Sequence, residues 1–522
     1  MNRFSLSFLV LVTAVPAAAQ EAPPPPSEAH ALCASPAGPV DPAILERPVA
    51  LREGIGRISQ KITTASPQAQ AFSDQGLAYL VSYVWIEAAR SFREALRSDP
   101  DCAMAWVGLA RAEQALSRGK EAAAAIEKAR TLAGRVSERE KRHIALRAQQ
   151  IEAEASTGEK EREKHQAYKD ALDKAIAADP SDAELWVLRG NAEEPGAWGR
   201  GQAGGVGAIA YYESALLRSP GHLAAHHFLI HAFENVGRHA EAAEHGKVYA
   251  EAAPKVAHAQ HMYGHVLPRV GRWKEALEQF EKADAIEREY AREEKIRPGD
   301  DWHHIHNLQL LAYTYLRLGR LWEAERTFRR AYATPARFLR SGWQQASLAE
   351  FLLLRGRAEE ALATARELSK RTPTIRAAGA AVEGEVLLAL GRPGEAREAA
   401  ARGREALKEA KTLAGHEARW IERFVQPHLD QLQAEIDMAG AGSAAAEGEI
   451  RSLAAELAAN PRFDAWGEGL FRLERIAEQA KRAGKTALAA QIHAQMRLID
   501  PEYAAGSTAR PIESPEVARV GR

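Results

Sequence analysis

Apolar and small residues recur along this chain at spacings that place them on one face of successive α-helices. Counting from Ala69 as position 1, one stretch has Phe72 at 4, Gly76 at 8, Tyr79 at 11, Ala88 at 20, Phe92 at 24, Ala95 at 27 and Pro100 at 32. Small residues let two helices approach closely, large residues fill the space between them, and proline ends the second helix. The pattern predicts an antiparallel helix pair.

The same pattern returns at intervals of about 34 residues. Clear copies contain the pairs Trp106 and Ala110, Gly190 and Tyr212, Gly264 and Phe280, and Ala312 and Phe328; weaker copies contain Gly237, Gly356, Gly391 and Gly484. One helix pair cannot bury its apolar face alone, so neighbouring pairs stack. The sequence therefore predicts an all-α solenoid of roughly eight to ten helical hairpins, with first-helix contacts at Gly76, Ala110, Gly190, Gly264 and Ala312.

This spacing is that of the tetratricopeptide repeat (TPR). Two histidine motifs follow in order, His227-Phe-Leu-Ile-His231 and His258-Ala-Gln-His261-Met-Tyr-Gly-His265. With these motifs, residues 55–335 resemble a family of bacterial TPR proteins with an HxxxH and an HxxHMxxH segment. The chain departs from the family at Pro220-Gly221-His222, where His-Pro-Gly is usual, and at Tyr263, where proline is usual. The resemblance implies a right-handed superhelix and no particular reaction.

Composition shifts divide the chain into segments. Residues 1–19 combine one early positive charge, an apolar stretch and a small-residue end, which is typical of a cleaved secretory signal. We expect an exported protein, periplasmic or secreted, with no membrane-spanning segment in the mature chain. The predicted segments are a signal peptide at 1–19, a proline-rich linker and N-terminal segment at 20–65, N-terminal TPR units at 66–180, histidine-rich units at 181–335, C-terminal units at 336–502 and a disordered tail at 503–522.

Charge and cysteine content exclude several classes of protein. The 69 basic and 70 acidic residues nearly cancel, which gives no reason to expect a nucleic-acid partner. Two cysteines are too few for a Cys-based structural zinc site, so a metal would need histidine and carboxylate ligands. Whether Cys33 and Cys102 form a disulfide stays open, because spacing alone cannot supply the Cα separation.

Histidines are concentrated in one part of the chain: 12 of the 18 lie between His222 and His306. In the repeat frame, His227 and His231 take positions 5 and 9 of one unit, and His258, His261 and His265 take positions 2, 5 and 9 of the next. These positions share one helix face, which in TPR proteins is the concave face. The five imidazoles are therefore expected to converge in one groove.

Converging imidazoles predict a divalent transition-metal site on His227, His231, His258, His261 and His265, with His306, Glu234 and His222 at its edge or behind the ligands. Zinc is slightly favoured, and copper or iron would also accept imidazole. The number of candidates allows one ion or two neighbouring ions. The alternative is a histidine-lined groove that hydrogen-bonds a peptide. Off-frame histidines are interpreted as surface or supporting residues: His226, His239, His245, His303 and His304.

Two functions follow from this pattern. The first is a scaffold that binds a protein or peptide in its concave groove, beside the metal site. The second is a metal-dependent enzyme of hydrolase type, in which Glu234 acts as general base. In either case metal binding should weaken below about pH 6.5, the ordinary pKa of histidine, because only neutral imidazole binds metal.

A glycine-rich stretch, Gly199-Arg-Gly201-Gln-Ala-Gly204, matches a dinucleotide-binding pattern, but no predicted strand precedes it. It is interpreted as part of an insertion over residues 193–205, between the two helices of one unit. Such an insertion would either lie over the groove as a lid or extend into solvent.

Overall fold

The computed structural model describes residues 40–197, 199–335, 341–414, 418–440, 444–459 and 465–500. The predicted signal peptide, the proline-rich stretch, Cys33 and the C-terminal tail lie outside these ranges, so the expectations for them stay predictions. Cys102 is buried and unpaired in the described chain.

The described residues are helical and contain no β-strand, as the periodicity predicts. The helices are α1 Pro42–Leu45, α2 Pro67–Val81, α3 Trp85–Ser98, α4 Ala103–Ala115, α5 Gly119–Leu132, α6 Glu138–Glu154, α7 Gly158–Ala178, α8 Ala183–Asn191, α9 Val206–Arg218, α10 Leu223–Asn235, α11 His239–Ala252, α12 Ala257–Val266, α13 Trp273–Glu293, α14 Trp302–Arg317, α15 Leu321–Ala333, α16 Ser341–Leu354, α17 Ala358–Leu368, α18 Pro373–Ala389, α19 Pro393–Ala414, α20 Ala418–Ala439, α21 Ala444–Ala459, α22 Leu470–Arg482 and α23 Thr486–Ile499. Short 3₁₀ turns occupy Ala133–Arg135, Leu267–Val270 and Pro298–Asp300, and a π-helical turn occupies Ala465–Gly469.

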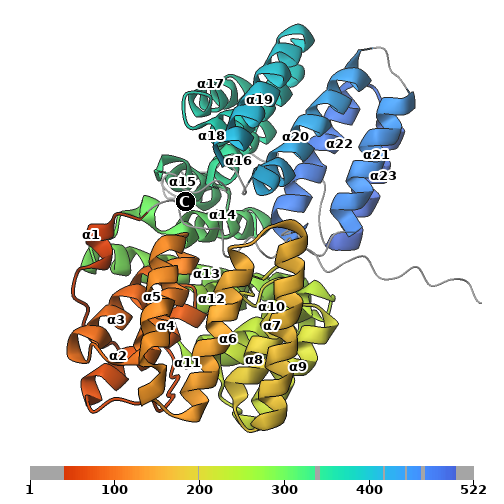
Figure 1. Ribbon diagram of the computed structural model, residues 1–522. Coiled ribbons are helices and arrows are strands. Elements are labelled where there is room, and N and C mark those ends of the chain that lie inside the picture. Colours follow the sequence, from red (N-terminus) through yellow and green to blue (C-terminus); the bar gives the residue numbers. More distant parts are fainter. Residues whose placement is uncertain are drawn as a thin grey trace, which may run out of the picture.

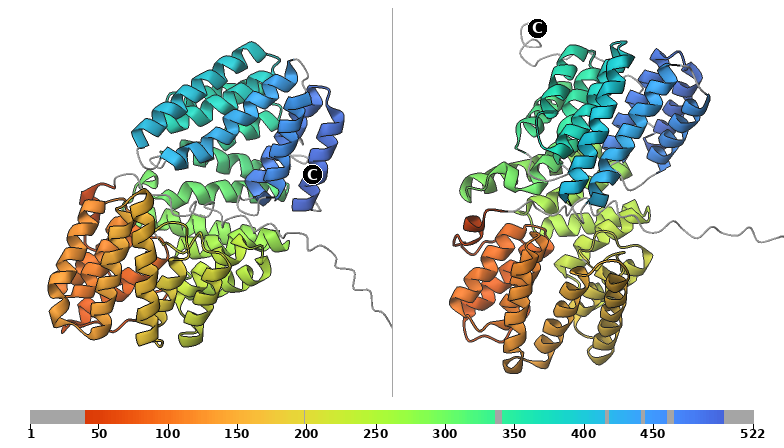
Figure 2. Two further views of the ribbon diagram at one scale, coloured as in Figure 1. Left: turned by 45° about the vertical axis from the view of Figure 1, so that its right-hand side comes forward. Right: turned by 45° about the horizontal axis from the view of Figure 1, so that its top comes forward.

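Consecutive helices pair, α2 with α3, α4 with α5, and so on through α18 with α19, and each pair contacts the next. The fold is an all-α helical-hairpin solenoid of the TPR type, as predicted. Figure 1 shows α1–α13 in a lower group and α16–α23 in an upper group, with α14 and α15 between them. Figure 2 shows the same two groups from other sides.

Glycines predicted at helix contacts do lie against large rings of the paired helix. A Cβ added at Gly76 would lie 2.7 Å from the Phe92 ring, and one at Gly190 would lie 2.4 Å from the Tyr212 ring. At Gly264 the nearest Phe280 atoms would lie at 3.2 Å. The close packing of each helix pair therefore requires a residue without a side chain at these positions.

Substituting Gly264→Leu is expected to destabilise the fold by about 1–3 kcal/mol, because the larger side chain overpacks the α12–α13 contact. Thermal unfolding followed by circular dichroism measures this. Gly448→Leu on α21 is the matched control, since no atom lies within 4 Å of a Cβ built there. Equal melting temperatures for the two variants would contradict the packing described.

The solenoid turns back on itself within its first units. Helix α2 contacts α10, which lies eight helices later in the chain. Tyr83, just after α2, donates a hydrogen bond from its hydroxyl to the Arg200 carbonyl at 2.7 Å. The end of α2 is thereby brought against the concave face of the histidine-rich units.

Residues 46–64, here called the N-terminal strap, belong to the predicted linker and N-terminal segment, and they lie against the helices. Gln75 on α2 accepts a hydrogen bond from Arg52 N and donates one to Ala50 O. Gly54 O accepts from Lys255 N at 2.8 Å, just before α12. Further on, Thr63 N donates to Glu140 at the start of α6. The strap therefore runs past α2, the turn before α12 and the start of α6.

The insertion between α8 and α9 packs onto α10 rather than extending into solvent. Asn235 on α10 donates hydrogen bonds to the carbonyls of Gln202 and Gly204. Gly201 has φ of 89°, and a Cβ there would lie 2.4 Å from the Phe228 ring. Glycine is required here because both the backbone conformation and the close ring exclude a side chain. Trp198 lies outside the described residues.

The C-terminal helices return to the histidine-rich units. The Trp466 ring lies 5.7 Å from the Trp273 ring and 6.1 Å from the Phe280 ring. An ion pair joins Arg317 on α14 to Asp500, just after α23. Within the described residues, no helix combines the length and apolar character that a bilayer crossing requires.

Candidate metal centre

Two neighbouring first helices carry the predicted ligands. His227 and His231 lie four residues apart on α10, and His258, His261 and His265 lie on α12, which contacts α10. Residues four apart share one face of a helix. The five side chains are therefore directed toward one side of the α10–α12 pair, and all five are buried.

Three of the five predicted ligands converge, and they are here called the histidine trio: His227, His231 and His258. The Nε2 atom of His227 lies 3.0 Å from Nε2 of His258 and 3.2 Å from Nε2 of His231. One ligand atom from each residue falls within 4.8 Å of the other two. Nitrogens bound at 2.0–2.1 Å around a tetrahedral metal lie about 3.3 Å apart. The two separations from His227 Nε2 are therefore close to the distance between two ligands of one metal ion.

The orientation of His227 is set from a distant part of the chain. Its Nδ1 lies 2.6 Å from the carbonyl oxygen of Val81, the last residue of α2. A carbonyl only accepts, so Nδ1 carries the hydrogen and Nε2 carries the lone pair. Such a bond behind a ligand commonly fixes the tautomer in metal sites. The His227 ring also stacks on Tyr249 with centroids 4.8 Å apart.

Burial keeps these imidazoles neutral. It lowers the pKa of His227 to about 3, and the hydrogen bond to Val81 opposes part of the change. The pKa values of His258 and His261 also lie well below the usual value, first through burial and then through neighbouring imidazoles. Neutral imidazole is the form that binds metal.

The remaining predicted residues are held by other partners. His261 Nδ1 lies 3.0 Å from Asn307 Oδ1. His265 Nδ1 donates to Glu234 Oε1 at 2.8 Å, and Arg269 donates to the same oxygen at 3.1 Å. The Glu234 carboxylate is thus already hydrogen-bonded on one oxygen.

Two edge residues also lie apart from the trio. His306 on α14 contacts the His261 ring, with centroids 4.8 Å apart. His222, the N-cap residue of α10, lies 3.6 Å from the Glu184 carboxylate. Neither belongs to the group of converging nitrogens.

His303 was interpreted as a surface or supporting residue, and the structure places it beside two of the predicted ligands rather than at the surface. The residue is buried, and its ring lies 5.0 Å from His258 and 4.5 Å from His261. Helix α14 begins at Trp302, because the Asp301 side chain accepts from His303 N and caps it. The helix therefore starts three residues before the repeat frame anchored on Ala312, and the extra residues bring His303 inward.

Sequence periodicity also missed the aromatic residues around the trio. Tyr83 lies 4.6 Å from the His227 ring and 5.0 Å from the His258 ring, measured between centroids. Trp302 lies 5.8 Å from His258 and stacks on Trp85. Tyr83 and Trp85 lie in the turn and helix after α2, so no local pattern connects them to α10 and α12.

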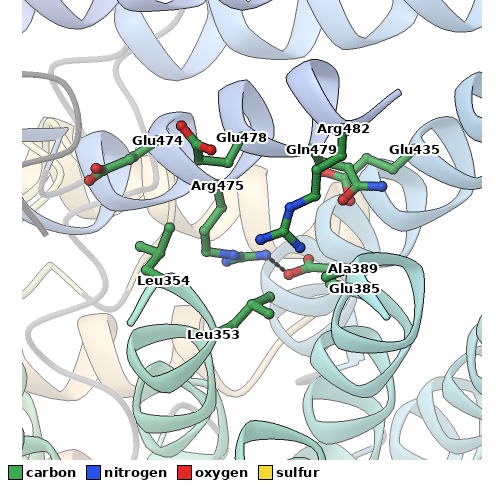
Figure 3. Close-up of a pocket in the computed structure, with 10 residues that line it drawn as sticks. All are labelled: Leu353, Leu354, Glu385, Ala389, Glu435, Glu474, Arg475, Glu478, Gln479 and Arg482. Atoms are coloured by element: carbon green, nitrogen blue, oxygen red, sulfur yellow. Dashed lines mark ion pairs between the residues drawn. The ribbon is translucent and has the colours of Figure 1, made fainter. Parts of the chain in front are cut away.

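A separate cavity of about 120 Å³ lies among α16, α18, α20 and α22. Figure 3 shows Arg475 directed at Glu385, with which it forms an ion pair. Arg475 also pairs with Glu350. Burial raises the pKa of Glu435 on its wall to about 7. The paired charges of this cavity hold the C-terminal helices together and lie apart from the histidine trio.

The fold and the trio together define a helical-repeat protein with a buried candidate metal centre. No protein-family model and no curated protein matches the sequence. Among solved structures, the chain is similar to MamA, with 20% identity over 32% of this chain and 87% of that one and a TM-score of 0.27. A tetratricopeptide repeat protein from Parabacteroides merdae has 14% identity over 55% of this chain and 98% of that one, with a TM-score of 0.35.

A third similar structure is YrrB, described as a TPR protein with an unusual peptide-binding site. It has 19% identity over 37% of this chain and 91% of that one, with a TM-score of 0.23. Because these scores are low, the fold assignment rests on the helix pairs of the protein itself.

Proposed function

We propose that the protein is an exported TPR-type scaffold that holds one divalent transition-metal ion on His227, His231 and His258. The observation that carries the proposal is the spacing of the three Nε2 atoms, at 3.0 and 3.2 Å from the central His227. Zinc suits a compact nitrogen site and is favoured, and copper(II) or iron(II) would also accept imidazole.

The number of hydrogens available to the three Nε2 atoms of the trio supports a bound cation. His227 Nε2 has no hydrogen, because Nδ1 donates to Val81. The two neighbouring Nε2 atoms would both have to donate to this one lone pair in the metal-free protein. A metal ion instead accepts all three lone pairs at once, which removes the competition.

The scaffold part of the proposal rests on the N-terminal strap. Its backbone hydrogen bonds at Ala50, Arg52 and Gly54 are an example, within this chain, of a non-helical segment held by side chains and backbone of the repeat units. A protein or peptide partner would be held in a similar manner by polar groups of the first helices that the strap does not occupy. The trio is buried, so its role would be to support the fold beside the binding surface.

Metal-dependent hydrolysis is the second candidate, and one observation favours it. Three converging ligands, rather than four, match catalytic zinc sites, which keep one position for water or substrate. A cavity of about 100 Å³ reaches His258. Glu234, proposed from sequence as general base, is engaged by His265 and Arg269.

Metal loading tests the proposal directly. Mature protein, expected to begin near Gln20, is recovered from an exported fraction, incubated with zinc, copper or iron at neutral pH, and exchanged into metal-free buffer. We expect about one equivalent of bound metal by elemental analysis, since the trio forms one site. X-ray absorption on the loaded sample then separates the two candidates, because an exchangeable oxygen ligand favours the enzyme. Retention of no metal would overturn both.

A further inference from the structure

The cavity beside the trio has walls that suit a cation. It has a volume of about 100 Å³ and lies between α2, α3, α12, α13 and α14. Five aromatic residues line it: Tyr79, Tyr83, Trp85, Tyr290 and Trp302. Aromatic faces attract positive charge, most strongly where water is largely excluded.

Carboxylates outnumber basic side chains around the same cavity. Glu287, Asp300 and Asp301 line it, and Lys255 is the one lysine or arginine among the described lining residues. Asp300 is held by Arg297, with Nε and Oδ2 2.7 Å apart. Burial and the nearby charge of Glu287 raise the pKa of Asp301. Carboxyl groups therefore predominate over basic side chains on this wall.

Three acceptor atoms on lining residues have no hydrogen-bond partner within the described chain. They are Oε2 of Glu287, Nε2 of His303 and Nδ1 of His258. The three residues are 3%, 5% and 2% exposed. Buried polar atoms are nearly always hydrogen-bonded, so three orphaned atoms around one cavity indicate a ligand.

The tautomers of the two histidines show that His303 Nε2 and His258 Nδ1 are acceptors. His303 Nδ1 is hydrogen-bonded to the Glu287 carboxylate and therefore carries the hydrogen, which leaves a lone pair on Nε2. His227 Nε2 is an acceptor, so His258 Nε2 donates to it at 3.0 Å and leaves a lone pair on Nδ1. All three orphaned atoms therefore need a hydrogen-bond donor.

We propose that this cavity binds the primary ammonium group of a small amine. The positive charge and N–H donors of an ammonium group suit a wall on which Glu287 Oε2, His303 Nε2 and His258 Nδ1 are unpartnered acceptors. The hydrocarbon part of the amine lies against the aromatic walls. The amine site uses other atoms than the metal site. It is complete in the metal-free protein, because a metal on His258 Nε2 would place the hydrogen on Nδ1 and remove that acceptor.

Calorimetric titration with butylamine tests the proposal. The protein is first treated with a chelator, because a metal on Nε2 of His258 would place the hydrogen on Nδ1. We expect one butylamine per chain. Tetramethylammonium, which has charge but no N–H, should bind about tenfold more weakly, and neutral pentanol more weakly still.

Two variants and one control make the test specific. Glu287→Gln should weaken butylamine binding about tenfold or more, because a charge-assisted acceptor is lost. Ala257→Leu, which fills the cavity from α12, should do the same without changing charge. Glu289→Gln, on the same helix but exposed, is the matched control and should change affinity less than about twofold. Circular dichroism confirms that each variant is folded.

Three results would overturn the inference: no butylamine binding, equal binding of tetramethylammonium, or unchanged affinity in both folded variants. Metal stoichiometry is measured on separate portions of each protein, loaded with metal and exchanged into metal-free buffer without chelator, and this keeps the two proposals separate. Protein that binds metal but not amine contradicts only the amine site, and protein that binds amine but not metal contradicts only the metal site.

Discussion

Replacing His227 with asparagine should lower metal affinity by about 100-fold or more, since ligand loss exceeds the 10–100-fold cost of losing a supporting partner. His227 is the central member of the trio, with its Nε2 close to both other ligand atoms. Competition against a chromophoric chelator measures the affinity.

His265→Asn is the informative comparison for this variant. The repeat frame predicts His265 as a ligand, whereas the structure pairs it with Glu234. The substitution should therefore leave most of the metal affinity. His245→Asn is the neutral control, because His245 lies 2.9 Å from His226 and outside the trio. A greater loss in His265→Asn than in His227→Asn would contradict the assignment of ligands.

Acidification should destabilise the metal-free protein strongly, beginning near pH 6.5. Unfolded histidine titrates near that pH, whereas the pKa of folded His227 is about 3 and that of His245 about 4. Between the pKa of the folded histidine and pH 6.5, the unfolded chain binds more protons than the folded protein. Stability is therefore present above pH 6.5 and falls by about 1.4 kcal/mol per pH unit for each such histidine.

Other buried groups enter the same balance. His258, His261 and His428 also have pKa values well below the usual range and act in the same direction. Glu154 and Glu435 act oppositely, because burial raises their pKa values to about 7 and the folded state binds the proton. The pKa values of Asp74, Glu87, Glu194, Asp301 and His304 are also raised, so these groups act with the two glutamates. The nine histidines of the described chain whose pKa values are lowered outnumber these seven groups, so the net change is a loss of stability.

Urea unfolding at pH 7.5 and pH 5 with chelator present measures the effect as a shift of the midpoint. His227→Asn should show a smaller shift than the wild type, since one of the titrating groups is absent. A midpoint that is unchanged or higher at pH 5 would contradict the expected sign. The result also refines the expectation for metal binding, because the lowered pKa values of His227 and His258 keep these two ligands neutral well below pH 6.5.

The sequence by itself determined the repeat and the helices that carry the histidines. Gly76, Gly190 and Gly264 could be assigned to helix contacts because a helix pair needs a small residue wherever a ring of its partner lies. The spacing of His227 and His231 likewise placed both on one face of α10, since that relation depends on helical geometry alone.

Only the tertiary structure decided which histidines meet. The carbonyl of Val81 orients His227 across 146 positions of sequence, and this contact exists because the solenoid turns back until α2 meets α10. An N-cap at Asp301 moved the start of α14 and brought His303 inward. The repeat pattern shows which face of a helix a residue occupies. The curvature of the solenoid depends on the sum of many small packing angles between neighbouring units, so the pattern does not predict contacts between distant units.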